Sequence, residues 1–368
     1  MRTIYLVSHA VISGPINQAL NILTGLKHSQ HTNAMLLTFI PESDKSWLSR
    51  FIDNGIEYKQ LNPIKKTNVI TCSRQLKQFV EENNIYVIHA SGFSACLVAL
   101  MGHGKAKVVI TQRCYPFEVA EELPKVFRPF ITHLYLWMIK RVNERVACSY
   151  SMQKAFADQV NINMKVVQNG VNTDYFKPID PNRKIELRRS LGLPTDKRIN
   201  LVLGVLLERK NNAMIIDAFK RMESSDNVLI FVGTGPQEEM LKNKAGDSKK
   251  IIFAGSTSRP LDYLQASDVL ISSSLAEGLP NTVLEALSCG LPCVLSDIDP
   301  HKELIEGTTA GVLFNTNSVD DLYEKIKESE HWVLSDKSQY ARKIAVENHG
   351  VISLAEKYEE IYRSVLNK

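Results

Sequence analysis

The chain has 368 residues, which is too long for one small hydrophobic core and suits two domains of roughly 150–200 residues each. Its 44% hydrophobic and 23% charged content is ordinary for a soluble globular protein, and its six cysteines show no paired framework, so we expect reduced cytosolic thiols and no disulfide scaffold. The net charge of +4 is uneven, because the first 180 residues carry 20 Lys and Arg against 13 Asp and Glu, and the remainder carries 24 against 27.

Three features bear on where the protein works. Met1 leads directly into the strand-like RTIYLVS, which predicts no signal peptide. The longest apolar run, near residues 129–139, is too short to span a bilayer. The basic first half fits an anionic membrane surface or an anionic acceptor, or else has no functional meaning. We expect a cytoplasmic protein, either free or held at the inner face of the cytoplasmic membrane, with no nucleic-acid partner.

The first half alternates strands with helices, notably at 17–27, 73–82 and 124–141. This order predicts βαβ units and a mostly parallel sheet covered on both faces. The expected strands are residues 3–8, 34–39, 57–61, 86–90, 108–112, 145–148 and 166–168.

The second half repeats the pattern, which predicts two Rossmann-like domains in tandem. The boundary is expected within 169–184, where Asn, Gly, Asp and two prolines cluster. We predict domains at 1–175 and 176–350, followed by a helical segment at 351–368. The expected strands are residues 200–204, 228–232, 251–254, 269–272, 293–295 and 311–314.

The segment that organises the second half begins with an apolar run at 268–274, which closes in serines as a buried strand does where it leaves the sheet. Glu277 begins a turn, and Pro280 is expected at the first position of a helix over 281–289. Gly290 is the expected C-terminal cap. The unpaired N–H groups and positive dipole end of that helix suit an anion such as a diphosphate.

Two carboxylates flank this expected anion site. Glu277 lies just before it, and Glu285 points away from the apolar face that Val283 and Leu287 share. Both are acceptors of the kind that bind sugar hydroxyls, so the segment predicts a nucleotide-sugar pocket. The alternative is that Thr282 and Glu285 form a capping box and that Glu285 is only solvated.

Residues 277–285, EGLPNTVLE, resemble the E-x7-E signature of the retaining GT-B glycosyltransferases of family four. The resemblance implies an α/β protein of GT-B architecture, with two Rossmann-like domains facing each other across a cleft and a last helix that crosses back to the N-terminal domain. It implies that Glu277 contacts the donor sugar, that Glu285 binds the ribose, and that the backbone between them holds the diphosphate. The donor-binding residues implied here are Glu277, Gly278, Leu279, Pro280, Asn281, Thr282 and Glu285.

The segment LVLGVLLERKN resembles the family stretch G-R-L-x-x-x-K-N, whose Arg and Lys clamp the donor diphosphate. Gly204 and Lys210 match, whereas Val205 stands where the family usually has Arg. We expect Arg209 to take over that role, the alternative being a solvated pair of cations at a helix start. The loop containing Ser256 is expected to contact the base.

The resemblance also reaches the first half. Gly14, within SGPIN, resembles the glycine turn that faces the donor phosphate, or it is a plain turn between a strand and a helix. His89 ends the fourth strand, where the family often carries a His, and Arg113 stands where many relatives place one. We expect both on the acceptor side, with structural roles as the alternative. The aromatic helix at 124–141, basic at both ends, suits peripheral contact with a membrane or packing in the core.

Three motifs are not interpreted as cofactor sites. The C-x3-C at 289–293 lacks a second Cys or His pair nearby. The G-x-G at 233–235 lacks the third glycine of a dinucleotide fingerprint. The D-x-D at 297–299 mimics the metal motif of a different glycosyltransferase fold. We therefore expect a metal-independent enzyme without a cofactor.

Together these features predict a retaining glycosyltransferase that moves a hexosyl or N-acetylhexosaminyl group. The expected donor is a UDP-sugar or another nucleoside-diphosphate sugar. The expected acceptor is a glycan or polyprenyl-diphosphate-linked saccharide in bacterial surface polysaccharide synthesis. Arg209, Lys210 and the backbone amides are expected to stabilise the departing diphosphate, and Glu277 to orient the sugar. Two alternatives remain: a nucleotide-sugar epimerase or hydrolase of GT-B fold, and a non-catalytic nucleotide-sugar-binding protein, for which Val205 is the best argument.

Overall fold

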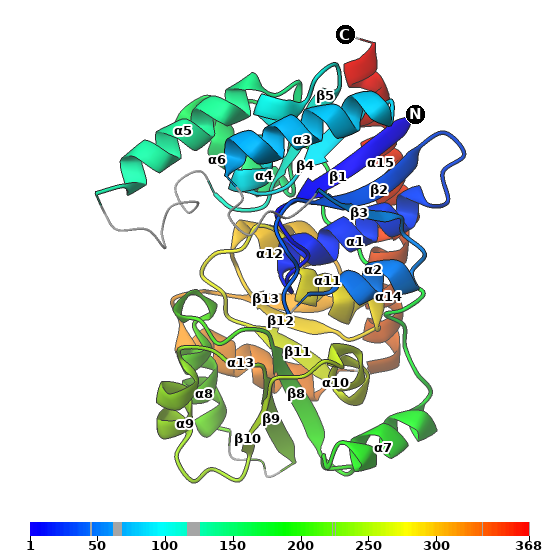
Figure 1. Ribbon diagram of the computed structural model, residues 1–368. Helices are drawn as coiled ribbons and strands as arrows, with labels where there is room; N and C mark the ends of the chain where they lie inside the picture. Colours follow the sequence, from blue (N-terminus) through cyan, green and yellow to red (C-terminus); the bar gives the residue numbers. More distant parts are fainter. Residues whose placement is uncertain are drawn as a thin grey trace. The chain divides into compact units, whose positions relative to one another are not determined.

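The computed structural model describes residues 1–44, 46–61, 68–115, 126–222, 224, 226–332 and 334–367. The chain divides into two compact units (Figure 1). Unit 1 comprises Met1–Gly170 and Val351–Lys368, and unit 2 comprises Val171–Gly350. The division therefore follows Gly170, whereas we expected it after residue 175, and the last helix belongs to the first unit. No helix in the described part of the chain is long and apolar enough to cross a bilayer.

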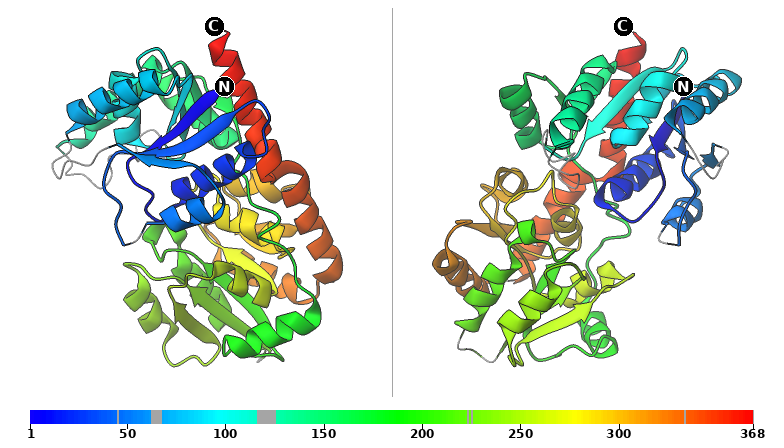
Figure 2. Two further views of the ribbon diagram at one scale, coloured as in Figure 1. Left: turned by 45° about the vertical axis from the view of Figure 1, so that its right-hand side comes forward. Right: turned by 60° about the vertical axis from the view of Figure 1, so that its left-hand side comes forward.

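Unit 1 is built on a seven-stranded parallel sheet of order β3-β2-β1-β4-β5-β6-β7. Helices lie on both sides of this sheet (Figure 2). The strands are β1 (Arg2–Val7), β2 (Asn33–Thr38), β3 (Tyr58–Gln60), β4 (Val87–Ala90), β5 (Lys107–Gln112), β6 (Glu144–Ala147) and β7 (Lys165–Val166). The helices are α1 (Gly14–Leu26), α2 (Leu48–Asp53), α3 (Val69–Glu82), α4 (Phe93–Gly102), α5 (Arg128–Arg141), α6 (Tyr150–Val160) and α15 (Val351–Leu366).

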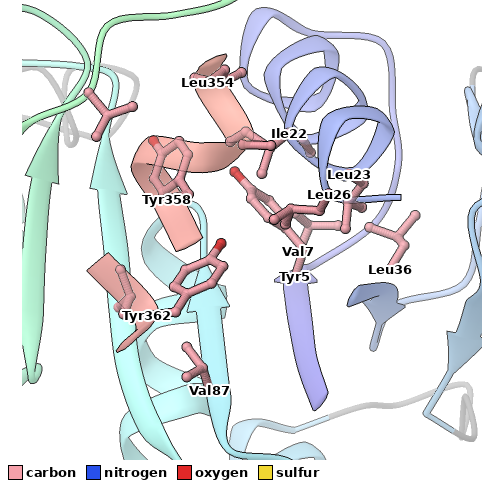
Figure 3. Packing of buried hydrophobic residues seen from close by; sticks show 14 of the residues in the cluster. Tyr5, Val7, Ile22, Leu23, Leu26, Leu36, Val87, Leu354, Tyr358 and Tyr362 are labelled. Atoms are coloured by element: carbon pink, nitrogen blue, oxygen red, sulfur yellow. The ribbon is translucent and has the colours of Figure 1, made fainter. Parts of the chain in front are cut away.

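One core cluster of unit 1 lies between the sheet, α1 and α15. Tyr358 and Tyr362 of α15 are fully buried and lie toward the strands in Figure 3, beside the buried Tyr5 of β1. Gly25 of α1 permits close approach of the two helices, because a Cβ added there would meet the Val351 carbonyl oxygen at 2.0 Å. Apolar burial on this face therefore holds the last helix within unit 1.

Unit 2 is built on a six-stranded parallel sheet of order β10-β9-β8-β11-β12-β13. Its strands are β8 (Arg198–Leu203), β9 (Asn227–Val232), β10 (Ile251–Gly255), β11 (Val269–Ser272), β12 (Cys293–Ser296) and β13 (Gly311–Phe314). Its α-helices are α7 (Pro181–Ser190), α8 (Asn212–Lys220), α9 (Glu238–Ala245), α10 (Pro260–Ala266), α11 (Asn281–Ser288), α12 (Asp299–Ile305), α13 (Val319–Glu330) and α14 (Leu334–His349), and η2 (Glu208–Lys210) is a single 3-10 turn.

Two parallel sheets with covering helices confirm the α/β prediction. Every predicted strand is present, with ends that differ from the prediction by no more than two residues. Buried parallel strands have short, continuous apolar sequences, so their positions could be predicted. Helix ends were predicted less well: α1 begins at Gly14, three residues before its predicted start, and α3 begins at Val69. The helix predicted at 124–141 begins at Arg128, and residues 124 and 125 lie outside the described residues.

A buried ion cluster fastens α7 to the sheet of unit 2. Asp268, just before β11, forms ion pairs with Lys184 at 2.7 Å and Arg188 at 2.6 Å, both from α7. The same carboxylate accepts a hydrogen bond from the Ile199 N–H of β8 at 2.8 Å. The side chains of Asp268 and Arg188 are only 12% and 8% exposed. If one of the two were removed, bulk water could therefore solvate the remaining charge only poorly.

Candidate active site

The loop between β11 and α11 has the predicted arrangement of strand, turn and helix, with one correction. The helix begins at Asn281, and Pro280 is its N-cap in extended conformation (φ −75°, ψ 114°), not its first helical residue as predicted. Thr282 consequently lies inside the first turn and cannot be the N-cap of a capping box, so that alternative is wrong. Gly290 has φ 70° and ends the helix as predicted.

Glu277 lies at the centre of an ion cluster in this loop. Its Oε1 accepts hydrogen bonds from Lys210 Nζ and from Ser274 Oγ, the latter at 2.8 Å. Its Oε2 lies 3.2 Å from Arg209 Nη1. Burial alone would raise the pKa of this carboxyl, but the two cations and the two hydrogen bonds lower it to about 2. Glu277 is therefore ionised at neutral pH.

The loop that follows β8 is tied to the loop that follows β11. The Leu275 N–H donates to the Arg209 carbonyl oxygen at 2.8 Å, and Ser273 Oγ donates to the Lys210 carbonyl oxygen at 2.8 Å. These bonds bring Lys210 and Glu277 together although they are 67 residues apart in the chain. The two loops leave adjacent strands at the carboxyl edge of the sheet, which is the usual ligand-binding edge in α/β folds.

A pocket lies against these loops within unit 2. It includes four of the residues predicted to bind the donor, Gly204, Lys210, Pro280 and Thr282, together with Ser272 and Ser274 at the end of β11. Lys210 is the single charged residue among the described residues that line it. A cation beside the first turn of α11 makes the pocket suited to an anion.

The other predicted donor residues of unit 2 are not among the described residues that line the pocket. Glu285 is partly buried on α11, and Leu279 is buried beneath the turn. Ser256 is exposed in the loop after β10, and Val205 is 55% exposed at the position of the family arginine. Gly278 and Asn281 are partly buried beside the pocket residues.

The G-x-G at 233–235 has a packing role. A Cβ added at Gly233 would meet the Gly204 carbonyl oxygen at 1.9 Å, and one added at Gly235 would meet the Leu206 carbonyl oxygen at 2.5 Å. Both glycines therefore allow the loop after β9 to lie directly against the loop after β8, which carries Arg209 and Lys210.

Sequence reasoning missed a chain of polar groups behind Glu277. Ser296 Oγ donates to the Ser274 carbonyl oxygen at 2.7 Å and lies 3.0 Å from His301 Nδ1. His301 is fully buried, and burial lowers its pKa to about 4, so the imidazole is neutral at pH 7. The serines that follow β11 could have indicated these polar contacts from the sequence. His301 could not, because its partners are set by the fold.

The apparent metal motifs have structural partners. Asp297 Oδ1 accepts hydrogen bonds from the hydroxyl and the N–H of Thr316, the latter at 2.9 Å. Cys289 and Cys293 are buried, and burial raises the pKa of both thiols. Within the described residues, no cluster of three His, Cys, Asp or Glu side chains could hold a metal ion.

In unit 1, His89 is a core residue and not an acceptor-side group, so that prediction was wrong. It is fully buried, and its Nδ1 and Nε2 lie 2.7 Å from the hydroxyls of Tyr362 and Thr111. Burial lowers the pKa of the imidazole well below its ordinary value, and the charge of Arg113 adds to this effect. Both ring nitrogens are satisfied inside the core, which leaves none for a substrate.

The other two residues singled out in unit 1 lie near each other at the carboxyl edge of its sheet. Gly14 is exposed at the first position of α1. Arg113 follows β5 and lines a separate pocket with Ser13 and Pro15, which flank Gly14. Of the residues predicted for a site in the first half, Gly14 and Arg113 therefore lie near each other, and His89 lies in the core.

Two family models match the chain. The model described as "Glycosyl transferases group 1" matches residues 183–345, and the model described as "Glycosyltransferase Family 4" matches residues 19–175. A galactosyltransferase of Escherichia coli, UDP-Gal:alpha-D-GlcNAc-diphosphoundecaprenol alpha-1,3-galactosyltransferase, is 26% identical over 260 residues, which cover 66% of this chain and 66% of that protein. The putative glycosyltransferase EpsD of Bacillus subtilis is 26% identical over 289 residues, which cover 74% of each chain.

The fold has solved counterparts. The crystal structure of Anabaena Alr3699/HepE in complex with UDP and glucose superposes with a TM-score of 0.81 at 18% identity, over 98% of this chain and 99% of that one. Two parallel α/β units with these strand orders, matched along nearly the whole chain by solved structures, define the GT-B fold class. The chain belongs to the GT-B glycosyltransferases of family 4.

Proposed function

We propose that this protein is a retaining glycosyltransferase that moves a hexosyl or N-acetylhexosaminyl group. The donor is a nucleoside-diphosphate sugar, preferentially a UDP-sugar. The acceptor is a glycan or polyprenyl-diphosphate-linked saccharide of a bacterial surface polysaccharide. The observation that carries the proposal is the cluster of Arg209, Lys210 and Glu277 beside the first turn of α11. The Escherichia coli relative, whose name gives a UDP-sugar donor and a lipid-diphosphate acceptor, supports the substrate class.

The charges of this cluster suit the departure of a diphosphate. As the glycosidic bond breaks, negative charge develops on the leaving oxygen, and Lys210 and Arg209 are held beside Glu277 where they can stabilise it. Glu277, with a pKa of about 2, is a weak base and stays unprotonated at neutral pH. The acceptor proton is therefore proposed to go to the leaving diphosphate oxygen, in a front-face substitution that needs no metal. Activity should accordingly survive treatment with EDTA.

The donor proposal is tested by a thermal-shift panel of UDP, GDP, ADP and UDP-sugars. We expect one nucleotide to raise the Tm selectively, and Glu285→Ala to lose most of that shift, because its carboxylate is proposed to bind the ribose. Glu306→Ala, which removes an exposed carboxylate of the same unit, is the control and should respond like the wild type. No shift with any nucleotide at millimolar concentration would count against the donor site.

Two other functions of the same pocket are distinguished by their products. A GT-B epimerase or hydrolase converts a UDP-sugar without an acceptor, so acceptor-independent turnover would favour it. A non-catalytic protein binds nucleotide-sugar and forms no product, and the exposed Val205 at the place of the family arginine is the observation that favours it.

We also propose that α5 contacts the cytoplasmic face of a membrane. Residues Phe130, His133, Trp137 and Arg141 are exposed and recur every three or four positions, so they form one stripe of the helix. Phe130 and Trp137 are 68% and 50% exposed, and the Arg141 guanidinium lies 4.9 Å from the Trp137 ring. Segment 126–143 carries no acidic residue. Exposed aromatics with basic neighbours suit an interface of anionic lipids.

Sedimentation with vesicles tests this contact. The wild type should bind vesicles of phosphatidylcholine and phosphatidylglycerol more strongly than vesicles of phosphatidylcholine alone. The double variant Phe130→Ala/Trp137→Ala should bind on the order of tenfold more weakly, because two aromatic side chains no longer enter the interface. Met240→Ala, at an exposed apolar residue of unit 2, is the control. If the double variant binds the anionic vesicles as strongly as the wild type and Met240→Ala do, α5 is not the membrane contact.

A further inference from the structure

A buried histidine of unit 2 lies behind the ion cluster of Glu277. His301 belongs to the first turn of α12, which begins shortly after β12, and its ring reaches back to Ser296 at the end of that strand. His301 is fully buried, and its Nε2 has no hydrogen-bond partner among the described residues. The ring therefore acts on its surroundings through Nδ1.

The hydrogen bonds fix which ring nitrogen carries the proton. His301 Nδ1 lies 2.9 Å from the Ser296 carbonyl oxygen and 3.0 Å from Ser296 Oγ. The carbonyl can only accept, and the single proton of the hydroxyl is donated to the Ser274 carbonyl oxygen at 2.7 Å. Neither oxygen can donate to Nδ1, so Nδ1 carries the proton. Because burial lowers the pKa of the ring to about 4, the neutral imidazole has no second proton for Nε2.

The same direction of donation continues to Glu277. Ser274 Oγ donates to Glu277 Oε1 at 2.8 Å, because an ionised carboxylate can only accept. Ser274 is thus held at two points, its carbonyl oxygen by Ser296 and its hydroxyl by Glu277. Successive donations therefore lead from the His301 ring, through the two serines, to the Glu277 carboxylate.

Lys210 depends on the same loop. Its Nζ donates to Glu277 Oε1, and its carbonyl oxygen accepts from Ser273 Oγ at 2.8 Å. Both charged groups lie within electrostatic reach of His301: burial dominates the pKa of the ring, the Glu277 charge raises it, and the Lys210 charge lowers it. A shift of the loop at Ser274 would therefore move both groups that are proposed to act on the donor.

We propose that His301 is a positioning residue for Glu277, acting through its Nδ1–H and the two serines between them. The inference rests on the proposed function and deepens it, because a residue behind the loop then sets the geometry of the carboxylate that orients the sugar. The ring is fully buried and acts without touching the substrate. A displacement of an orienting group by about 1 Å can lower a rate on the order of a hundredfold.

Two substitutions separate the roles of the ring nitrogens. His301→Asn places an amide N–H near the position of Nδ1, whereas His301→Gln places its amide near the position of Nε2. We expect kcat of glycosyl transfer to fall on the order of tenfold to a hundredfold in His301→Gln and less than about threefold in His301→Asn. A merely structural role would lower the Tm of both variants without separating their kcat values.

Two further variants complete the test. Ser296→Ala removes the linking hydroxyl, so it should reproduce the loss of kcat, and it keeps the test valid if His301→Gln folds poorly. Asn227→Ala is the control, because it removes a buried polar side chain at the amino end of β9, the opposite edge of the same sheet. It should lower the Tm and leave kcat unchanged.

The position of the proton is tested without any substrate. A long-range proton–nitrogen NMR correlation spectrum of the wild type should show His301 as the Nδ1–H tautomer, assigned by its absence from the spectrum of His301→Asn. The Nε2–H tautomer overturns the proposal, as do a wild-type kcat in His301→Gln and equal losses of kcat in the Asn and Gln variants.

Failure of the proposed function is distinguishable from failure of this inference. If the wild type transfers no sugar, the proposed function fails, and crystal structures of the two variants decide the positioning role. Glu277 should then be displaced in His301→Gln and unmoved in His301→Asn. An unmoved Glu277 in both crystal structures overturns the inference.

Discussion

Lys210→Ala should lower turnover on the order of a hundredfold or more. A single donor to the charge that develops on a leaving group is typically worth about 2.7–4 kcal/mol in the transition state, and Lys210 is the charged residue of the pocket. The measurement is the steady-state rate of nucleoside diphosphate release. Lys242→Ala, which removes an exposed lysine of the same unit, should leave that rate unchanged.

The effect of this substitution should also depend on Glu277. Lys210 and Arg209 together balance one carboxylate, so removing Lys210 leaves Glu277 with less compensation. The double variant Lys210→Ala/Glu277→Gln should therefore lose less than the two single losses combined, because the groups act in one network. A tenfold or smaller loss in a correctly folded Lys210→Ala variant would remove Lys210 from the proposed role.

Asp268→Ala should lower the free energy of unfolding by about 3–5 kcal/mol. The substitution leaves Lys184 and Arg188 without their carboxylate in a largely buried position and removes the acceptor of the Ile199 N–H. Urea unfolding followed by circular dichroism measures the loss. Asp320→Ala removes an ion-paired carboxylate that is 82% exposed, so it should change stability by less than about 0.5 kcal/mol. A comparably small change for Asp268→Ala would contradict the importance of the cluster.

The contribution of Asp268 should depend on pH in a defined direction. Burial raises the pKa of this carboxyl, but Lys184 and Arg188 outweigh burial and lower it below the ordinary value. The folded state therefore binds fewer protons than the unfolded state, and the stabilisation is present above the unfolded pKa and lost as the pH falls through the folded pKa. The difference between wild type and Asp268→Ala should shrink in acid for this reason.

The sheets and the loop between β11 and α11 could be predicted well from the sequence because both depend on local patterns. Apolar runs of four to six residues mark buried parallel strands, and the spacing of Glu277 and Glu285 is set by one turn and one helix. The direct contact of Lys210 with Glu277 was not predicted, because it is set by bonds between loops far apart in the chain.

The errors at His89 and His301 arose where distant parts of the chain decide the environment. His89 ends a strand, as many ligand-binding residues do, yet Tyr362 of the last helix covers it from 273 residues away. Pro280 was placed one position too far into its helix, because proline is accepted both at the first helical position and just before it. His301 is buried by its surroundings and carries no local signal.

Glycosyl transfer by this protein is tested most directly by acceptor-dependent release of nucleoside diphosphate. Wild-type protein would be incubated with each UDP-sugar and a synthetic farnesyl-diphosphate-linked N-acetylglucosamine, and the products followed by phosphorus and proton NMR. We expect UDP to appear only when the acceptor is present, together with a new α-linked sugar. Release without acceptor, a β-linked product, or no release from a donor that binds would contradict a retaining glycosyltransferase.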